Sequence, residues 1–130
     1  MNYIEDAIKT EPSYEDVIGR FTERTARLKH AADGMCTESG EFLDTLKKYM
    51  YYGKPIDEVN LVEELGDMLW YIAIAADTLG VTFEQIQTIN INKLKARYPN
   101  KFTSSDAINR DLDTERKILE NGLDTGSCSC

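Results

Sequence analysis

Residues 57–79 read DEVNLVEELGDMLWYIAIAADTL, and this stretch decides the fold class. Its apolar side chains recur at helical spacing, and the run 68–76 carries no charge at all. A turn signal around Pro55 precedes the stretch, and Gly80 marks its end. We therefore expect a long helix that is buried nearly all round, either by its own bundle or by another subunit.

The sequence on both sides of this stretch also reads as helix. Helices are predicted over residues 13–33, with Ser13 as the N-cap and Gly34 at the end, over 37–51 and over 82–98. Few runs show the alternation that signals strands, so the predicted fold class is all-α. Short connections favour antiparallel neighbours, which predicts an antiparallel four-helix bundle.

The C-terminal region is predicted to add one more helical segment. Residues 103–120 read as a helix with Ser104 or Ser105 as its cap. We expect a single domain over residues 1–120, followed by a flexible, Gly/Ser-rich tail over 121–130.

The charge of the chain limits its partners. The 130 residues include 15 basic and 23 acidic side chains, for a formal net charge of -8. Such a charge repels DNA, RNA and anionic lipid surfaces, so we expect neither a nucleic-acid polymer nor a membrane as a partner. A small polyphosphate is still compatible, because bound divalent cations reverse the field locally.

The cysteines and the N-terminal sequence indicate the compartment. Cys36, Cys128 and Cys130 are an odd number and form no disulfide framework, which favours a reducing compartment. No basic-then-apolar leader follows Met1, and no apolar run is long enough to span a bilayer. We expect a cytoplasmic protein.

Two acidic motifs of the same form lie in neighbouring predicted helices. Glu38 and Glu41 form the first, Glu64 and Asp67 form the second, and each motif is followed by an apolar pair. Because residues three apart share a helix face, antiparallel packing can gather the four carboxylates. Carboxylate oxygens are ligands for hard cations, so Mg²⁺ is the expected cofactor, with Mn²⁺ as a substitute.

The neighbours of these acids bear on the metal hypothesis. Gly40 and Gly66 each precede the second acid, and a glycine inside a helix costs about 1 kcal/mol relative to alanine, so we expect both to permit close helix approach. Glu64 falls on the shoulder of the apolar stripe, where surface acids are rare. The alternative is an ordinary solvated acidic face. A shared cation is favoured, because four uncompensated acids beside an apolar surface would be costly.

The arrangement E-x-x-E, 22 residues, then E-x-x-D resembles the signature of the MazG-like, all-α nucleoside triphosphate pyrophosphohydrolases. Residues 90–99, NINKLKARYP, are similar to that family's N-x-x-K-L-x-x-R-Y-P segment. The resemblance covers roughly residues 28–111. One departure is Thr37, which precedes Glu38 where many members have a second acid, and Glu63 is the candidate to replace that acid.

The resemblance implies roles for individual residues. The metal ligands would be the two acidic motifs, Glu38, Glu41, Glu64 and Asp67. Lys93 and Arg97 would contact the triphosphate, and Tyr71 would line the nucleotide pocket. Asn90 shares one helix face with Lys93 and Arg97 by its spacing, so it is a further candidate for substrate binding.

The implied activity is Mg²⁺-dependent hydrolysis of a nucleoside triphosphate to monophosphate and pyrophosphate, in the control of nucleotide pools. In the expected mechanism an activated water attacks the α-phosphorus, with Glu41, or else Glu38, as the catalytic base. The resemblance also makes dGTP or GTP the first candidate substrate. It further implies a homo-oligomer, either a dimer or a tetramer.

Other readings stay open. The protein could instead hydrolyse dUTP or phosphoribosyl-ATP with the same fold, or be a non-catalytic helical assembly protein with a structural cation. His30 is the sole histidine, which argues against a Ser-His-Asp triad, and we expect it on the surface at a helix end. Trp70 and the tyrosines at 49–52 are expected in the core or an interface in preference to stacking on a base.

Overall fold

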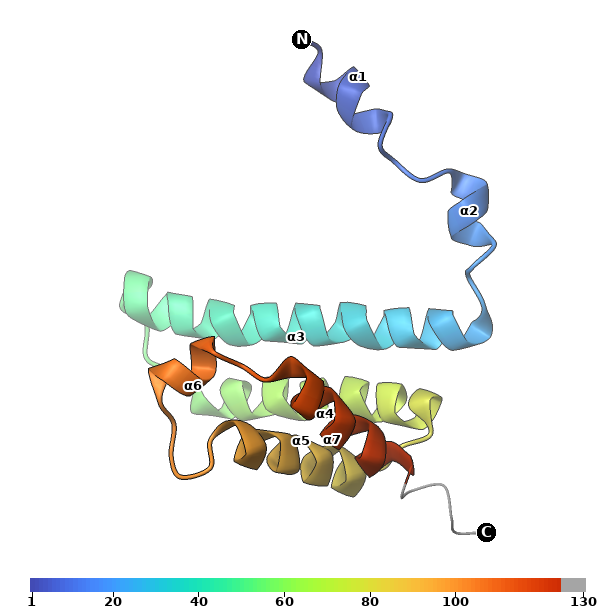
Figure 1. Cartoon of the computed structure of the whole chain (residues 1–130). Coiled ribbons are helices and arrows are strands. Elements are labelled where there is room, and N and C mark those ends of the chain that lie inside the picture. Colours follow the sequence, from blue (N-terminus) through green and yellow to red (C-terminus); the bar gives the residue numbers. More distant parts are fainter. Residues whose placement is uncertain (125–130) are drawn as a thin grey trace. The chain divides into compact units, whose positions relative to one another are not determined.

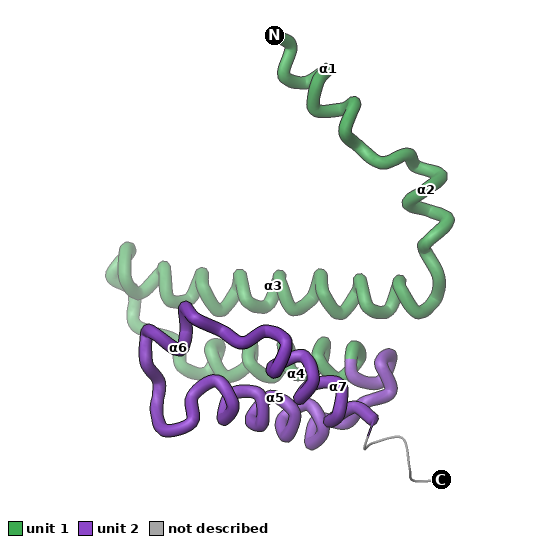
Figure 2. The backbone as a smooth tube through the Cα atoms, in the orientation of Figure 1, with its two compact units in different colours: residues 1–75 green, residues 76–130 purple. Residues whose placement is uncertain are grey.

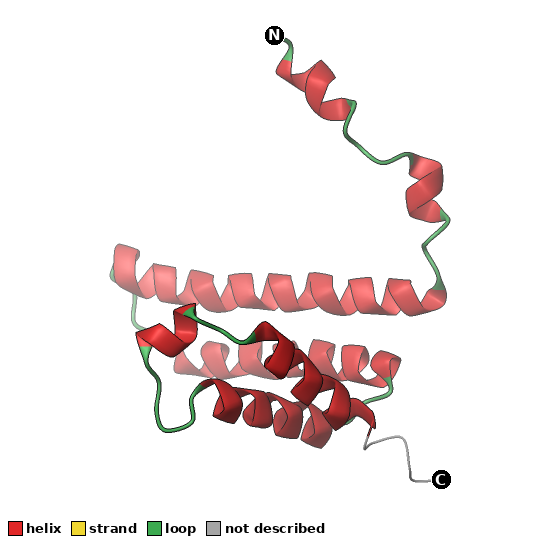
Figure 3. Cartoon of the chain, viewed as in Figure 1, coloured by secondary structure: helices red, strands yellow, loops and turns green. Residues whose placement is uncertain are grey.

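The computed structural model describes residues 1–124, and every regular element in that range is a helix (Figure 1, Figure 3). The all-α fold class is confirmed. In chain order the helices are α1 (Tyr3–Ile8), α2 (Tyr14–Ile18), α3 (Glu23–Tyr52), α4 (Glu58–Leu79), α5 (Phe83–Arg97), α6 (Ser104–Ile108) and α7 (Leu112–Asp124). Within this range, no helix combines the length and the apolar character that crossing a membrane requires.

The chain divides into two compact units, residues 1–75 and 76–130 (Figure 2). The first unit holds α1, α2, α3 and most of α4, and the second holds the end of α4 with α5, α6 and α7. The single domain over residues 1–120 and the four-helix bundle stay predictions. Of the predicted flexible tail, residues 121–124 belong to α7, and the remainder, with Cys128 and Cys130, lies outside the described residues.

The ends of the long helices follow their sequence signals. Gly53 ends α3 and Gly80 follows α4, with φ angles of 63° and 71° in the left-handed region that glycine adopts without steric cost. Asp57 opens α4 by accepting a hydrogen bond from the backbone N–H of Asn60 at 3.1 Å. Thr82 opens α5 with a reciprocal capping box. The predicted helices over 57–79 and 82–98 are therefore confirmed.

One continuous helix, α3, stands where two are expected on either side of Gly34. The predicted helix end is wrong, because Gly34 is buried in the interior of α3. The helix predicted from Ser13 is interrupted earlier in the sequence. Ser13, the expected N-cap, opens only the short α2, and Thr22 opens α3 with a capping box. A glycine inside a helix costs only about 1 kcal/mol relative to alanine, and packing of the Tyr71 ring against Gly34 compensates for this cost.

The C-terminal region contains two helices, α6 and α7, in place of the one expected over residues 103–120. Their caps are Thr103 and Asp111, so the predicted caps Ser104 and Ser105 are wrong. Each cap side chain accepts a hydrogen bond from the backbone N–H three residues further on. These two competing caps divide the segment, because each one starts a helix of its own.

Two contacts fix how α3 and α4 pair in the first unit, where the helices lie side by side and antiparallel (Figure 1). The ring of Tyr71 on α4 lies over Gly34 of α3. The Thr45 hydroxyl of α3 donates a hydrogen bond to Asn60 Oδ1 of α4 at 2.5 Å. Thr45 lies eleven residues after Gly34 on α3, and its partner Asn60 lies eleven residues before Tyr71 on α4. Both contacts therefore define the same antiparallel register.

The second unit is held by α5 packing against α7. Ile89 is buried against Gly122, where an added Cβ would lie 2.4 Å from Ile89 Cγ1. Arg97 forks onto the buried Glu115: Nε donates to Oε1 at 2.8 Å and Nη2 to Oε2 at 2.6 Å. Arg110 donates to the same carboxylate, with its Nη2 at 2.6 Å from Oε2. Two cations from the chain therefore neutralise one buried acid.

The chain's own helices do not bury α4 all round. Val62, Leu69 and Trp70 keep 67%, 55% and 55% of their surface exposed. The buried hydrophobic residues of the described range are few and mostly small, namely Ala31, Ala76 and Ile89. Both expected ways to bury the rest of α4, by its own bundle or by a second subunit, stay predictions.

Gly34→Ala should destabilise the protein, although alanine is the better helix former. The added Cβ would lie 2.1–2.3 Å from three atoms of the Tyr71 ring, and such overpacking costs about 1–3 kcal/mol. Gly40→Ala in the same helix is the matched control, because its Cβ would meet no atom within 4 Å; it should stabilise by roughly 0.5–1 kcal/mol. Urea unfolding followed by circular dichroism measures both changes. Equal stability of the two variants would contradict the packing of Tyr71 on Gly34.

The Arg97–Glu115–Arg110 cluster predicts a specific pH dependence of stability. Hydrogen bonds from Arg97 and then Arg110 hold the pKa of Glu115 down, from an ordinary value of 4.5 to about 2. A lowered pKa in the folded state means that the carboxylate stabilises the protein above pH 4.5 and loses this contribution as the pH falls toward 2. Glu115→Gln should therefore lower the Tm by several degrees at pH 7, and the difference from wild type should shrink below pH 4.5.

Thermal unfolding of both proteins between pH 7 and pH 2.5 checks this dependence. Glu120→Gln is the matched control on the same helix, because Glu120 pairs with Arg116 on the surface and exposes 50% of its side chain. This control should change Tm little at any pH. A Glu115→Gln effect that is absent, or that does not vary with pH, would show that the ion cluster does not stabilise the fold.

Candidate metal centre

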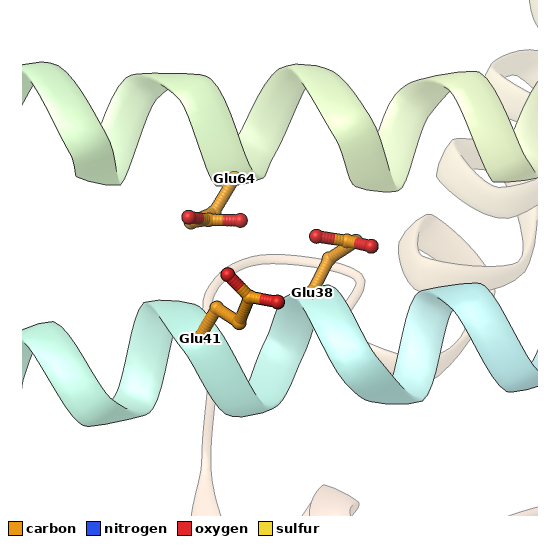
Figure 4. Close-up of side chains that lie close together, drawn as sticks. All are labelled: Glu38, Glu41 and Glu64. Carbon is orange, nitrogen blue, oxygen red and sulfur yellow. The ribbon is translucent and has the colours of Figure 1, made fainter.

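Three carboxylates converge between α3 and α4 (Figure 4). Glu38 and Glu41 project from α3, and Glu64 projects from α4 toward them. One oxygen of each carboxylate lies within 4.8 Å of those of the other two. Among residues 1–124, no other group of three or more His, Cys, Asp or Glu side chains lies close enough together to share a metal ion.

The register of the two helices explains this convergence. Four residues back from Thr45 on α3 is Glu41, and four residues forward from Asn60 on α4 is Glu64, so these two acids face each other. Glu38 lies one turn from Glu41 on the same face of α3. Glu64 is only 3% exposed, whereas Glu38 is half-buried and Glu41 is exposed. The three-carboxylate group is therefore shielded from solvent at Glu64 and accessible to solvent at Glu41.

The electrostatics of the group favour a bound cation. Burial raises the pKa of Glu64, a hydrogen bond from Asn60 lowers it, and the nearby Glu38 carboxylate raises it again. Among the described residues, no Lys or Arg forms an ion pair with any of the three acids. Three carboxylates at this spacing repel one another, and a divalent cation between them would turn repulsion into attraction.

The donor set also fits a hard divalent cation. All three ligands offer carboxylate oxygen, the donor that Mg²⁺, Mn²⁺ and Ca²⁺ prefer. Oxygens that bind Mg²⁺ at about 2.0–2.1 Å lie roughly 3 Å apart when adjacent and roughly 4 Å apart when opposite. The separations here stay within 4.8 Å. Small side-chain adjustments would bring the oxygens to these separations.

The fourth predicted ligand, Asp67, is not part of this close group. It lies on α4 one turn beyond Glu64, with an exposed side chain. The register that sets Glu41 against Glu64 also sets Glu38 against Asp67, three residues further along each helix. The helix positions therefore suit a fourth ligand, although the Asp67 carboxylate lies outside the group of three.

The two glycines beside the acids do not act as expected. An added Cβ at Gly40 or at Gly66 would meet no heavy atom within 4 Å. The prediction that these glycines permit close approach of the two acidic helices is therefore wrong within this chain. Gly34 is the glycine that serves close packing between α3 and α4.

Tyr71 lies on the same helix pair as the acids, one turn beyond Asp67. Its half-buried ring packs on Gly34 and meets the Trp70 ring edge to face, with the centroids 4.8 Å apart. His30 meets the Tyr71 ring in the same way at 5.5 Å. His30 is exposed, as predicted, but it lies inside α3, so the expectation of a helix end is wrong.

The three predicted substrate contacts on α5 belong to the second unit. Asn90 is exposed and Lys93 is half-buried. Arg97 exposes only 15% of its side chain, because it forms the ion pair with Glu115. Sequence reasoning missed this partner, since it lies 18 residues away in a helix whose start is mispredicted.

Two further residues at the site, Thr45 and Asn60, are absent from the sequence prediction. Asn60 Nδ2 donates a hydrogen bond to Glu64 Oε1 at 2.7 Å, and Thr45 in turn donates to Asn60. A signal for them does exist in the sequence. Thr45 follows Glu41 by one helical turn and Asn60 precedes Glu64 by one turn, so both polar side chains share the faces of the acids.

Comparison with known proteins places these residues in a family. The family model for the MazG nucleotide pyrophosphohydrolase domain matches residues 27–102, which include the acidic motifs and the segment 90–99. The Gene 37 protein of Mycobacterium phage L5 is 31% identical over 74 residues, which are 54% of this chain and 65% of the phage protein. The match thus spans a little less than two thirds of that relative. No solved structure gives a significant match. The chain belongs to the MazG nucleotide pyrophosphohydrolase domain family.

Proposed function

We propose that the protein hydrolyses nucleoside triphosphates to nucleoside monophosphate and pyrophosphate, using Mg²⁺ or, as a substitute, Mn²⁺. The proposed ligands are Glu38, Glu41, Glu64 and Asp67. The observation that carries the proposal is the convergence of three carboxylates from two facing helices, in a chain of the MazG nucleotide pyrophosphohydrolase family. Mg²⁺ commonly binds both carboxylates and substrate phosphates, which suits a site that is open at Glu41.

The chemistry of hydrolysis assigns a role to each acid. When bound, Mg²⁺ neutralises phosphate charge and lowers the pKa of a water molecule. Glu41 is the proposed base, because it is the exposed member of the group, and one of its carboxylate oxygens accepts a proton from the attacking water. The water oxygen bonds to the α-phosphorus, the bond from that phosphorus to the bridging oxygen breaks, and pyrophosphate leaves. Glu38, one turn away, is the alternative base.

Basic residues of α5 are proposed to stabilise the departing pyrophosphate. We propose that the Arg97 guanidinium, whose Nε and Nη2 form the fork onto Glu115, also contacts a phosphate oxygen. Because Arg97 shares its charge with Glu115, Lys93 is the main cationic contact in this proposal. Asn90 would add a hydrogen bond from the same helix face.

An aromatic pair beside the acids is proposed to receive the nucleotide base. Tyr71 lines this position, and the adjacent Trp70 exposes 55% of its surface, which leaves ring area for stacking. We propose dGTP or GTP as the first substrates to test, with a role in nucleotide-pool control in the cytoplasm. Hydrolysis of dUTP or phosphoribosyl-ATP by the same acids is the alternative.

We also propose that the protein is a homo-oligomer, a dimer or a tetramer, that associates through α4. Val62, Leu65 and Leu69 follow i, i+3, i+7 spacing and expose 67%, 49% and 55% of their surface. Exposed apolar stripes of this kind mark association surfaces. Gly66 lies beside the stripe with open space at its Cβ position, so a helix of a second copy could approach closely there.

The activity proposal predicts that the protein releases pyrophosphate from at least one member of a panel of standard and modified (d)NTPs with Mg²⁺, and that EDTA stops the release. Glu41→Gln should lower kcat at least about 100-fold, because an amide cannot accept the proton. Glu23→Gln, an exposed acid at the start of the same helix, is the matched control and should keep full activity.

The results separate the alternatives. Cation binding without pyrophosphate release from any nucleotide would favour the non-catalytic assembly protein with a structural cation. Full activity in Glu41→Gln, at unchanged helical content, would refute the assignment of Glu41 as the base.

The assembly proposal predicts that light scattering after size exclusion gives a mass of two or four chains. Leu69→Asp should shift the mass toward one chain, because it places a charge in the apolar stripe. Leu112→Asp, at a comparably exposed leucine that begins α7, should leave the mass unchanged. A wild-type protein that is a stable monomer would contradict the proposal.

A further inference from the structure

Thr45, Asn60 and Glu64 form a hydrogen-bonded relay from α3 into the candidate metal centre. The Thr45 hydroxyl donates to Asn60 Oδ1 at 2.5 Å, and Asn60 Nδ2 donates to Glu64 Oε1 at 2.7 Å. Thr45 is 7% exposed and Glu64 is 3% exposed, with the half-buried Asn60 between them. The relay is therefore shielded from water for most of its length.

The chemistry of these groups gives the relay one direction. An ionised carboxylate can only accept hydrogen bonds, so the Asn60 amide must turn its NH₂ group toward Glu64 and its carbonyl toward Thr45. The Thr45 hydroxyl then satisfies the carbonyl by donating to it. A flipped amide would turn its carbonyl toward the carboxylate and lose the hydrogen bond to Glu64, which is unfavourable for buried polar groups. Glu64 is thus held at Oε1.

A neutral donor suits this position better than a charged one. A Lys or Arg beside Glu64 would neutralise the carboxylate and compete with a cation for it. The Asn60 amide orients the carboxylate without adding charge, so the negative charge of Glu64 stays available. Asn60 and Glu64 both lie on α4, and the hydrogen bond from Thr45 connects this pair to α3, which carries Glu38 and Glu41.

We propose that Asn60 and Thr45 are positioning residues that set the cation affinity of the site by fixing the Glu64 carboxylate. This inference rests on the proposed function, since it assumes a divalent cation at Glu64, Glu38 and Glu41. Residues that hydrogen-bond to a metal ligand without contacting the metal typically contribute about 10–100-fold to metal affinity. Neither residue touches the substrate in this proposal.

Mn²⁺ binding, followed through the EPR signal of free Mn²⁺, tests the inference without any nucleotide. Asn60→Ala should raise the Kd for Mn²⁺ about 10–100-fold. Thr45→Val keeps the side-chain shape but removes the hydroxyl, so it should raise the Kd by a smaller factor, and Thr45→Ser should restore wild-type affinity. Asn92→Ala, at an exposed asparagine on α5, is the matched control and should bind Mn²⁺ as wild type does.

Kinetics separate positioning from a general loss of structure. In Asn60→Ala the Mg²⁺ concentration for half-maximal activity should rise, while kcat at saturating Mg²⁺ recovers. A general loss of structure would instead lower kcat at every Mg²⁺ concentration, saturating Mg²⁺ included, and would reduce the helical content measured by circular dichroism. A measurement on the wild-type protein needs no substitution: the side-chain NH₂ signals of Asn60 in a ¹⁵N-resolved NMR spectrum should shift when Mg²⁺ is added.

The possible failures are distinguishable. A wild type that binds Mn²⁺, with unchanged Kd in Asn60→Ala and Thr45→Val, overturns this inference and leaves the proposed hydrolysis standing. Asn60 signals that do not respond to a bound cation overturn it as well. A wild type that binds no divalent cation overturns both the positioning role and the proposed function.

Discussion

The antiparallel register of α3 and α4 is the constraint on which the rest of the structure depends. It is fixed at two points, the Tyr71 ring over Gly34 and the hydrogen bond from Thr45 to Asn60. The acidic motifs lie between these points. A shift of one residue would turn either helix by about 100° relative to its partner and carry the carboxylates apart. Two contacts between uncharged residues thus determine where the carboxylates meet.

Residues 1–124 contain two buried glutamates, Glu64 and Glu115, whose surroundings have opposite effects on their charge. Glu115 receives hydrogen bonds from Arg97 and Arg110, and its pKa falls to about 2. Glu64 has no cationic partner among the described residues, and burial raises its pKa. Within residues 1–124, its hydrogen-bond donor is the neutral Asn60 amide. In the proposed function, a divalent cation from solution would neutralise Glu64 as Arg97 and Arg110 neutralise Glu115.

Much of the fold could be predicted from local signals, and the exceptions have physical reasons. Gly53 and Gly80 follow helix ends in the left-handed backbone conformation that glycine adopts without steric cost, whereas Gly34 lies inside its helix, where Tyr71, distant in sequence, packs on it. The acids of the site follow from their spacing within single helices. Their neighbours Thr45 and Asn60, and the pairing of Arg97 with Glu115, depend on a register between helices, which no single segment encodes.

An anomalous diffraction measurement on crystals soaked in Mn²⁺ tests the central claim most directly. The account predicts an anomalous peak between α3 and α4, with carboxylate oxygens of Glu38, Glu41 and Glu64 at coordination distance from it. The account would be contradicted if the metal bound elsewhere or not at all, with the three carboxylates turned toward water.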